Sequence, residues 1–301
     1  MGLSGGSDSV ALTHLLRELA EHGAYTLVTL AHLNHRLRPS AARDEAFCRQ
    51  FAERLGLRIV VEAADVQSFA QENRLSLEDA ARRVRYDFLE GVAAREGATR
   101  IAVGHTQDDQ AETLLLKLMR GAGLTGLAGI HPRRGTVIRP LLDVTRGELR
   151  AYLRVRGEGW VEDETNDDLD NPRNRIRHRI LPELDLAAGG TTRPALARAA
   201  ALIREDGQWL DELADERYRA LALETDAGVE LDVAALTGTP SPVRSRVLLR
   251  AMRRAGGREI GLEHVEAVLG LLAGNQGGID VPGSRAELRG ATLVLVHQRR
   301  T

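Results

Sequence analysis

The stretch Leu3-Ser4-Gly5-Gly6-Ser7-Asp8-Ser9 decides the fold expected for this chain of 301 residues. Two adjacent glycines let the backbone turn tightly and bring its N–H groups close to a ligand. Apolar residues follow at helical spacing, at Val10, Leu12, Leu15, Leu16 and Leu19. The loop is therefore predicted to open a helix, whose unpaired N–H groups and partial positive charge favour a bound phosphate.

Asp8 sets this loop apart from a plain glycine turn before a serine-capped helix, which remains the alternative on this motif alone. A carboxylate beside a phosphate repels it unless a divalent cation joins the two. The loop lacks the Gly-Lys-Ser/Thr ending of a Walker A loop. It resembles the pyrophosphate-binding loop, Ser-Gly-Gly-x-Asp-Ser, of ATP pyrophosphatases. That resemblance implies ATP and Mg²⁺ as ligands of the loop, with Asp8 nearest the metal and Ser4, Gly5, Gly6, Ser7 and Ser9 around the phosphates.

The composition limits the classes of protein that fit. Hydrophobic residues make up 43% of the chain and charged residues 28%, as in an ordinary globular protein long enough for about two domains. The single cysteine, Cys48, excludes an internal disulfide and any Cys-x-x-Cys site. The net charge is −2, so a nucleic-acid partner would need local basic patches. No apolar run reaches membrane length and no signal peptide is visible, so we expect a cytoplasmic protein with no membrane partner.

Strands and helices alternate along the first half of the chain. Strands are predicted at 25–31, 57–62, 100–104 and 135–142, and helices at 41–55, 76–96 and from Thr145 to Arg156. This order predicts an α/β fold, a Rossmann-like parallel sheet with right-handed crossovers. The strand that should feed the phosphate loop would lie at the sheet centre, but only Met1-Gly2-Leu3 precede Ser4. We therefore expect the natural protein to start upstream, with the first strand truncated here.

A second polar stretch, Gly104-His105-Thr106-Gln107-Asp108-Asp109-Gln110-Ala111-Glu112-Thr113, follows the third predicted strand and enters a helix. Asp109 and Glu112 are three residues apart and share one helix face. Two interpretations stay open at this point. The carboxylates could simply complement the helix dipole, or they could form a site for a metal or an amine.

Four segments together resemble one family. They read AHLNHRLRPSAARDEAFC (31–48), GHTQDDQAETLLLKLMRGAGLTGLAGI (104–130), RPLL (139–142) and NPRNRIRHRILPEL (171–184). In this order they are similar to the tRNA(Ile)-lysidine synthases. The resemblance implies that ATP adenylates the wobble cytidine of a tRNA(Ile) with a CAU anticodon at C2. The ε-amine of free L-lysine then displaces AMP.

The resemblance also implies roles for individual residues. Asp109 and Glu112 match positions associated with the lysine amine, and Arg85 and Arg139 match arginines near the nucleotide or the target base. Asn174 and Arg177 are expected to point into the active site. The implied catalytic residues are Asp8, Arg85, Asp109, Glu112 and Arg177, and the implied nucleotide contacts add His32, His105 and Arg139 to the loop. Asp8→Ala is expected to abolish adenylation, and Glu112→Ala to harm mainly the lysine step.

The predicted domains are an ATP-binding catalytic domain at 1–186 and a smaller, mostly helical tRNA-binding domain at 193–301. The second would contain helices from Pro194 to Ala222, at 243–255 and at 261–273, followed by three short terminal strands. On the helix at 243–255, Arg246, Arg250, Arg253 and Arg254 could form one basic face, either solvated or facing RNA. The acidic segment at 162–170 and the arginines after it could be a surface connection or an RNA contact. Longer members carry a further C-terminal domain that is expected to be absent or rudimentary here, and a homodimer is compatible with the resemblance.

Two competing functions fit parts of the sequence. One is another enzyme on the same fold, but Cys48 alone excludes a thiolase that uses paired cysteines, and no glutaminase domain is visible. The other is a non-catalytic nucleotide- or RNA-binding protein, against which the intact Asp8, Asp109 and Glu112 argue.

Overall fold

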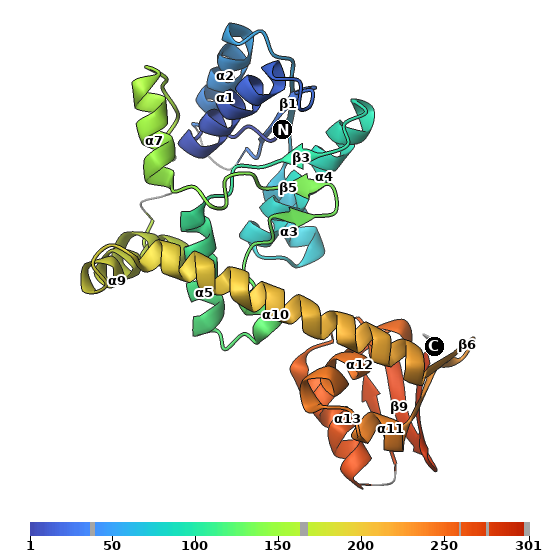
Figure 1. The fold of residues 1–301 in the computed structure, drawn as a ribbon. Coiled ribbons are helices and arrows are strands. Elements are labelled where there is room, and N and C mark those ends of the chain that lie inside the picture. Colours follow the sequence, from blue (N-terminus) through green and yellow to red (C-terminus); the bar gives the residue numbers. More distant parts are fainter. Residues whose placement is uncertain (37–39, 163–167, 259, 275–276, 298–301) are drawn as a thin grey trace. The chain divides into compact units, whose positions relative to one another are not determined.

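The computed structural model describes residues 1–36, 40–162, 168–258, 260–274 and 277–297. The chain divides into two compact units, Met1–Ile203 and Arg204–Thr301, which are treated separately below (Figure 1). Arg38 and Pro39 of the polar segment after the first predicted strand lie outside the described residues. So does the middle of the predicted acidic segment, residues 163–167.

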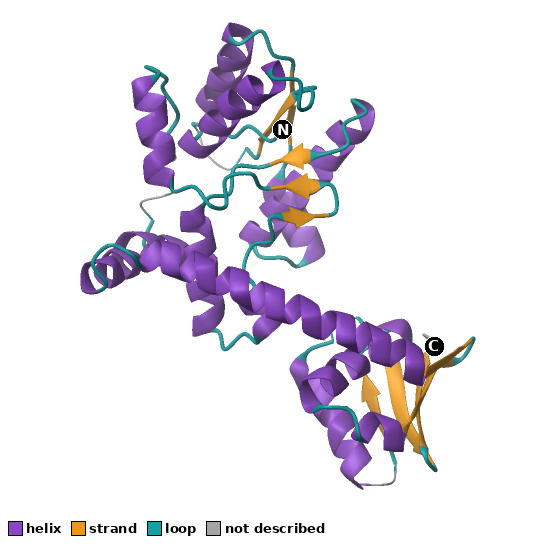
Figure 2. Cartoon of the chain, in the orientation of Figure 1, coloured by secondary structure: helices purple, strands orange, loops and turns teal. Residues whose placement is uncertain are grey.

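The first unit is built on a mostly parallel sheet (Figure 2). Strand β1 (Leu30–Asn34) pairs with β2 (Ile59–Ala63), and β3 (Ile101–Ala102) pairs with β5 (Val137–Ile138), both in parallel. Strand β4 (Arg133–Arg134) pairs with β5 in the antiparallel sense and was not predicted.

Residues Met1–Leu3 lie between the two pairs of strands. The Leu3 N–H donates to the Ala31 carbonyl over 2.8 Å, and the Gly2 N–H donates to the Ala102 carbonyl over 3.0 Å. The Ala31 N–H in turn donates to the Met1 carbonyl over 2.8 Å. These three residues therefore take the central position expected for the strand that precedes the phosphate loop.

Helices cover both faces of this sheet. The helices of the first unit before α10 are α1 Ser7–Glu21, α2 Ala41–Arg54, α3 Val66–Asn73, α4 Leu77–Arg95, α5 Gln107–Met119, α6 Leu124–Leu127, α7 Arg146–Val155, α8 Pro172–Arg175, the π-helix Ile176–Ile180, and α9 Leu181–Ala187. Neighbouring residues of a strand point to opposite faces. Leu30 accordingly packs in a core with α1, α2 and α7, whereas Ala31 packs in a second core with α4. The structure thus has the layered α/β arrangement that the sequence predicted.

Strand β1 begins later than predicted. The expected strand at 25–31 is replaced by Leu30–Asn34. The side chain of Tyr25 contacts helix α1, and its hydroxyl donates to the Leu16 carbonyl over 2.7 Å. The shift moves His32 from a predicted loop into the sheet.

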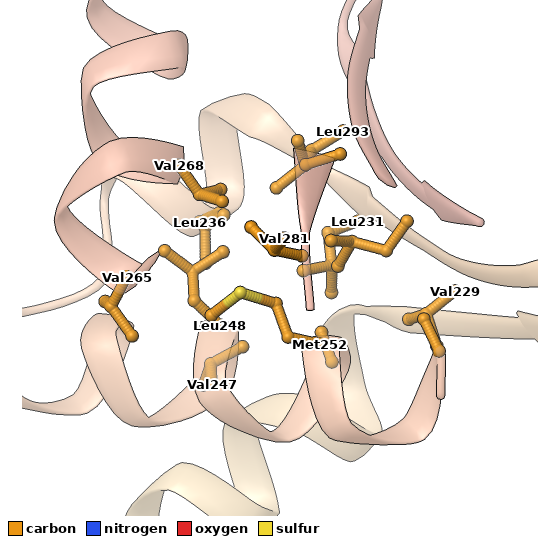
Figure 3. Close-up of a cluster of buried hydrophobic side chains, with 14 of the residues drawn as sticks. Val229, Leu231, Leu236, Val247, Leu248, Met252, Val265, Val268, Val281 and Leu293 are labelled. Carbon is orange, nitrogen blue, oxygen red and sulfur yellow. The ribbon is translucent and has the colours of Figure 1, made fainter. Parts of the chain in front are cut away.

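The second unit combines helices with an antiparallel sheet. The boundary between the units falls within α10 (Thr192–Leu221), and the helices after it are α11 Val233–Thr237, α12 Ser241–Arg254 and α13 Leu262–Gly274. The strands are β6 Ala222–Thr225, β7 Gly228–Asp232, β8 Gly278–Val281, β9 Ser284–Arg289 and β10 Thr292–His297, in the order β6-β7-β10-β9-β8. Leu231, Leu248, Met252 and Leu293 pack in one fully buried core (Figure 3). The sequence predicted β8 to β10 but neither β6 nor β7.

Three arginines of the predicted basic face on α12 have acidic partners within the second unit. Arg246 and Arg250 both pair with Asp211, Arg250 also pairs with Asp215, and Arg254 pairs with Glu224. Arginines that neutralise carboxylates of their own chain are less available to phosphates. These three arginines are therefore paired within their own unit, and of the three only the side chain of Arg254 is largely exposed.

Candidate active site

The loop Ser4–Ser9 connects the central residues of the sheet to α1 and leaves backbone donors free. Gly5 has φ +89°, and a Cβ there would lie 3.3 Å from the Cys48 sulfur. The Ser9 hydroxyl accepts from the Ser4 N–H and donates to the Gly6 carbonyl, which fixes the turn. The N–H groups of Ser7, Asp8 and Ser9 have no acceptor among the described residues, and no side chain caps the helix. A phosphate would satisfy these donors.

Gly104 brings a second segment against this loop. A Cβ at Gly104 would lie only 3.2 Å from the carbonyl carbon and oxygen of Asp8, so a larger residue would push the two segments apart by a few tenths of an ångström. Two residues later Thr106 caps α5, and the Asp109 carboxylate accepts from the Thr106 N–H over 2.8 Å. The close approach and the cap together position Asp109 beside the loop.

The Arg146 guanidinium lies among the carboxylates of both segments. Its nitrogens are 3.1 Å from Asp8, 3.1 Å from Asp109 and 3.7 Å from Glu112, and its side chain is 17% exposed. Its backbone N–H donates to the Asp108 carboxylate over 2.8 Å. Arg146 thus links the predicted ATP loop to the predicted amine site.

Burial and charge act in opposite directions on these groups. Burial alone would raise the pKa of Asp109, but Arg146, His105 and the Thr106 N–H outweigh it and hold that pKa below its usual value. Burial raises the pKa of Asp8, which Arg146 offsets only in part. Burial would lower the pKa of Arg146, but the carboxylates around it raise that pKa instead, so the guanidinium stays charged.

Two further arginines hold Glu112, which is fully buried. Arg177 donates from Nε and Nη2 to the two carboxylate oxygens over 2.6 and 3.0 Å, and the Arg173 Nε lies 3.2 Å from Glu112. Arg173 also donates to the Thr113 hydroxyl over 2.7 Å. The side chain of Asn174 is buried and donates to the Asp168 carbonyl. The structure therefore places Arg177 in the cluster with Glu112, whereas the amide of Asn174 contacts the segment before α8.

The predicted histidines lie close to the loop and to Asp109. His32 is buried, and its Nδ1 is 2.9 Å from the Leu3 carbonyl, so it supports the backbone before the loop. Burial lowers the pKa of His105 to about 4, which leaves a neutral imidazole near Asp109 and Arg139. His105 Nδ1 is a buried nitrogen without a hydrogen-bond partner among the described residues. This atom is free to contact a ligand.

The other two predicted arginines contact different partners. Arg139 donates to the Tyr86 hydroxyl over 3.2 Å and to the His131 carbonyl over 2.7 Å. Arg85 is exposed, and its Nη2 is 3.3 Å from His35 Nε2. Neither makes a contact with Asp8, Asp109 or Glu112 in the described part of the chain.

Sequence reasoning missed Arg146, although one signal was present. Thr145 and Glu148 form the expected capping box at the start of α7. A cation at the first helical position, beside that cap, opposes the helix dipole, which favours acidic residues there. Such a residue needs a partner outside its own helix, and Arg146 finds three.

The donor set fits a metal that arrives with phosphate. Among the described residues, no group of three histidine, cysteine or carboxylate side chains could hold a metal ion alone. Mg²⁺ commonly takes one or two protein carboxylates together with phosphate and water oxygens. Asp8, within the loop, offers one such carboxylate.

The first unit has a parallel sheet, a loop after its central position that can accept an anion, and carboxylates beside that loop. These features define an ATP-binding domain of the PP-loop class. Residues 1–184 match the PP-loop domain family, and residues 231–295 match the TilS substrate binding domain. The chain belongs to the tRNA(Ile)-lysidine synthase family. A U34-tRNA thiolase from Methanococcus maripaludis has a similar fold, with a TM-score of 0.56 and 19% identity over 68% of this chain and 70% of that one.

Three relatives named tRNA(Ile)-lysidine synthase support the assignment. The one from Geobacter sulfurreducens is 42% identical over 89% of this chain and 58% of its own length. The one from Thermus thermophilus is 40% identical over 99% of this chain and 57% of its own length. The one from Chlorobaculum tepidum is 37% identical over 94% of this chain and 85% of its own length. The chain therefore spans less than three fifths of the Geobacter and Thermus relatives.

Proposed function

We propose that this chain ligates L-lysine to C2 of the wobble cytidine in tRNA(Ile) with a CAU anticodon. In the first step the cytidine O2 attacks the α-phosphorus of ATP and diphosphate leaves. In the second step the lysine ε-nitrogen attacks C2, the bond from C2 to the adenylated oxygen breaks, and AMP leaves while the nitrogen gives up protons. The observation that supports this most directly is the contact of Arg146 with both Asp8 and Asp109, which makes the phosphate loop and the amine carboxylates neighbours.

Each group of side chains has a distinct task in this proposal. The N–H groups of the loop bind phosphate, and Asp8 binds the Mg²⁺ that accompanies ATP, which would neutralise charge on the leaving diphosphate. Asp109 and Glu112 bind the lysine ammonium, which two carboxylates suit well. Arg139, which donates to the Tyr86 hydroxyl, and Arg85, which lies beside His35, are assigned to the nucleotide or the target base.

Location and assembly remain predictions. The described residues contain no helix long and apolar enough to cross a membrane. A cytoplasmic location follows from the proposed tRNA substrate. Homodimer formation stays a prediction of the family resemblance.

Mass spectrometry of the wobble nucleoside tests the proposed function. The chain is incubated with CAU-anticodon tRNA(Ile), Mg²⁺, ATP and lysine, and the tRNA is then digested to nucleosides. We expect cytidine to gain the mass of lysine less water, only when all four components are present. Diphosphate release that depends on tRNA, without this gain, would point to another amine. Neither signal would favour a non-catalytic nucleotide- or RNA-binding protein.

A further inference from the structure

The charges around the amine carboxylates are balanced in the structure. Three carboxylates meet three guanidiniums. Arg146 pairs with Asp8, Asp109 and Glu112, Arg177 pairs with Asp109 and Glu112, and Arg173 pairs with Glu112. Each carboxylate therefore already has a counter-ion. A buried, balanced cluster gains little from one more cation, because the desolvation of that cation is not repaid. An ammonium can bind well here only after a guanidinium has moved away.

Arg146 is the guanidinium best placed to move. Arg173 and Arg177 approach Glu112 from the segment 172–180, and Arg193 pairs with Asp108 and Asp185 away from the loop. Arg146 alone among these four contacts Asp8, with 3.1 Å between Nε and Oδ2. A polyphosphate bound to the N–H groups of Ser7, Asp8 and Ser9 would therefore arrive beside its guanidinium.

We propose that Arg146 exchanges partners when ATP binds. Without nucleotide its guanidinium occupies the subsite for the lysine ammonium, between Asp109 and Glu112. The phosphates of ATP draw it away through charge-assisted hydrogen bonds, and the vacated carboxylates then receive the ammonium. This inference rests on the proposed function and adds to it that nucleotide and lysine strengthen each other's binding, since coupling between two ligands is reciprocal.

Calorimetric titration of the whole chain with lysine tests the exchange. Lysine is titrated with and without Mg²⁺ and α,β-methylene-ATP, an analogue that cannot release diphosphate. For the wild type we expect the analogue to tighten lysine binding by about tenfold or more, which corresponds to roughly 1.4 kcal/mol.

Two variants and a matched control isolate Arg146. Arg146→Gln leaves the cluster one cation short, so lysine should bind about tenfold tighter when nucleotide is absent. The analogue should no longer change the affinity for lysine. The analogue itself should bind more weakly than it binds to the wild type. Arg146→Lys keeps the cation and should still exclude lysine when nucleotide is absent. Arg154→Gln, the same substitution at an exposed position of α7, should match the wild type in all three measurements.

Several outcomes would overturn the exchange. The first is a wild type that binds lysine equally well with and without the analogue. The second is Arg146→Gln binding lysine no tighter than the wild type. The third is Arg146→Lys binding lysine as tightly as Arg146→Gln does. The wild-type comparison decides even where a variant fails to fold. If the wild type forms lysidine but shows no coupling, the inference fails and the function stands. If it forms no lysidine, the function fails, and an analogue affinity unchanged in Arg146→Gln would remove Arg146 as a phosphate contact as well.

Discussion

The buried carboxylate of Glu112 has more than one positive partner, which determines what its removal does. Glu112→Ala would leave the guanidiniums of Arg177 and Arg173 without their main partner. Removal of one member of a buried ion pair costs about 3–5 kcal/mol. We expect a loss of that size in the free energy of unfolding, measured with urea. Glu62→Ala, which breaks an exposed pair with Arg95, should cost no more than about 1 kcal/mol. Equal losses would show that the Glu112 cluster is open to water.

The assignment of Asp8 to the adenylation step and of Glu112 to the lysine step is therefore best tested with isosteric variants. Asp8→Asn removes the charge that would bind Mg²⁺ and should abolish the adenylated tRNA intermediate. Glu112→Gln keeps the shape of the side chain but weakens the attraction for an ammonium, so the intermediate should accumulate while lysine transfer fails. The intermediate is measured with tRNA and α-labelled ATP, with and without lysine. Equal loss of the intermediate in both variants would contradict the assigned roles.

His105 makes stability depend on pH. In the unfolded chain its pKa is close to the usual 6.5, whereas burial lowers the pKa to about 4 in the folded chain. Between these values the unfolded state binds more protons, so the free energy of unfolding falls as pH drops from 6.5 to 4. Burial lowers the pKa of His14 and His32 too, so His105→Gln should reduce this slope without removing it. Urea unfolding at pH 4.5 and pH 7 measures the slope, and a slope identical to the wild type would contradict the shift.

At the scale of elements, the start of α7 carries both a cap and a site residue. The Thr145 hydroxyl accepts from the Glu148 N–H over 3.1 Å, and Arg146 is the first residue of the helix. Loss of such a cap costs about 1 kcal/mol. Thr145→Ala should lower the urea midpoint and also reduce lysidine formation, because the first turn that presents Arg146 frays.

Ser76→Ala provides the matched control for this cap. Ser76 caps α4 in the same way, through the Asp79 N–H, but no predicted site residue lies in the first turn of that helix. We expect a similar loss of stability with activity close to the wild type. Equal losses of activity in the two variants would show that the effect of Thr145→Ala comes from general destabilisation.

Local signals predicted most elements, and long-range pairing explains the rest. The cap at Thr145 and the alternation of apolar runs with helical patterns are readable within a few residues, and the structure confirms the helices they predicted. Strands β4 and β6 are short and largely exposed, so they lack the apolar pattern that marks a strand. Arg146 was missed because its partner Asp8 lies 138 residues away in the sequence. Only a folded chain brings those two charges together.

At the scale of the whole chain, each of the two units is stabilised by its own hydrophobic core. Leu153 of α7 is fully buried in the core that supports the ATP loop, and Leu248 of α12 is fully buried in the core of the second unit. Truncation of either side chain to alanine leaves a cavity and costs about 2–5 kcal/mol. The two variants should therefore destabilise different parts of the chain by similar amounts.

Nucleotide binding distinguishes the two cores. A ligand that binds the folded form raises the stability of the unit that holds its site. Calorimetric melting is measured with and without Mg²⁺ and α,β-methylene-ATP. The analogue should raise the melting temperature of the transition that Leu153→Ala lowers, and it should leave unchanged the melting temperature of the transition that Leu248→Ala lowers. Leu248→Ala should also keep its affinity for the analogue at 25 °C, because every group assigned to the phosphates lies in the first unit. If Leu248→Ala weakens analogue binding as much as Leu153→Ala does, the two cores unfold together, and the second unit is then required for the nucleotide site itself.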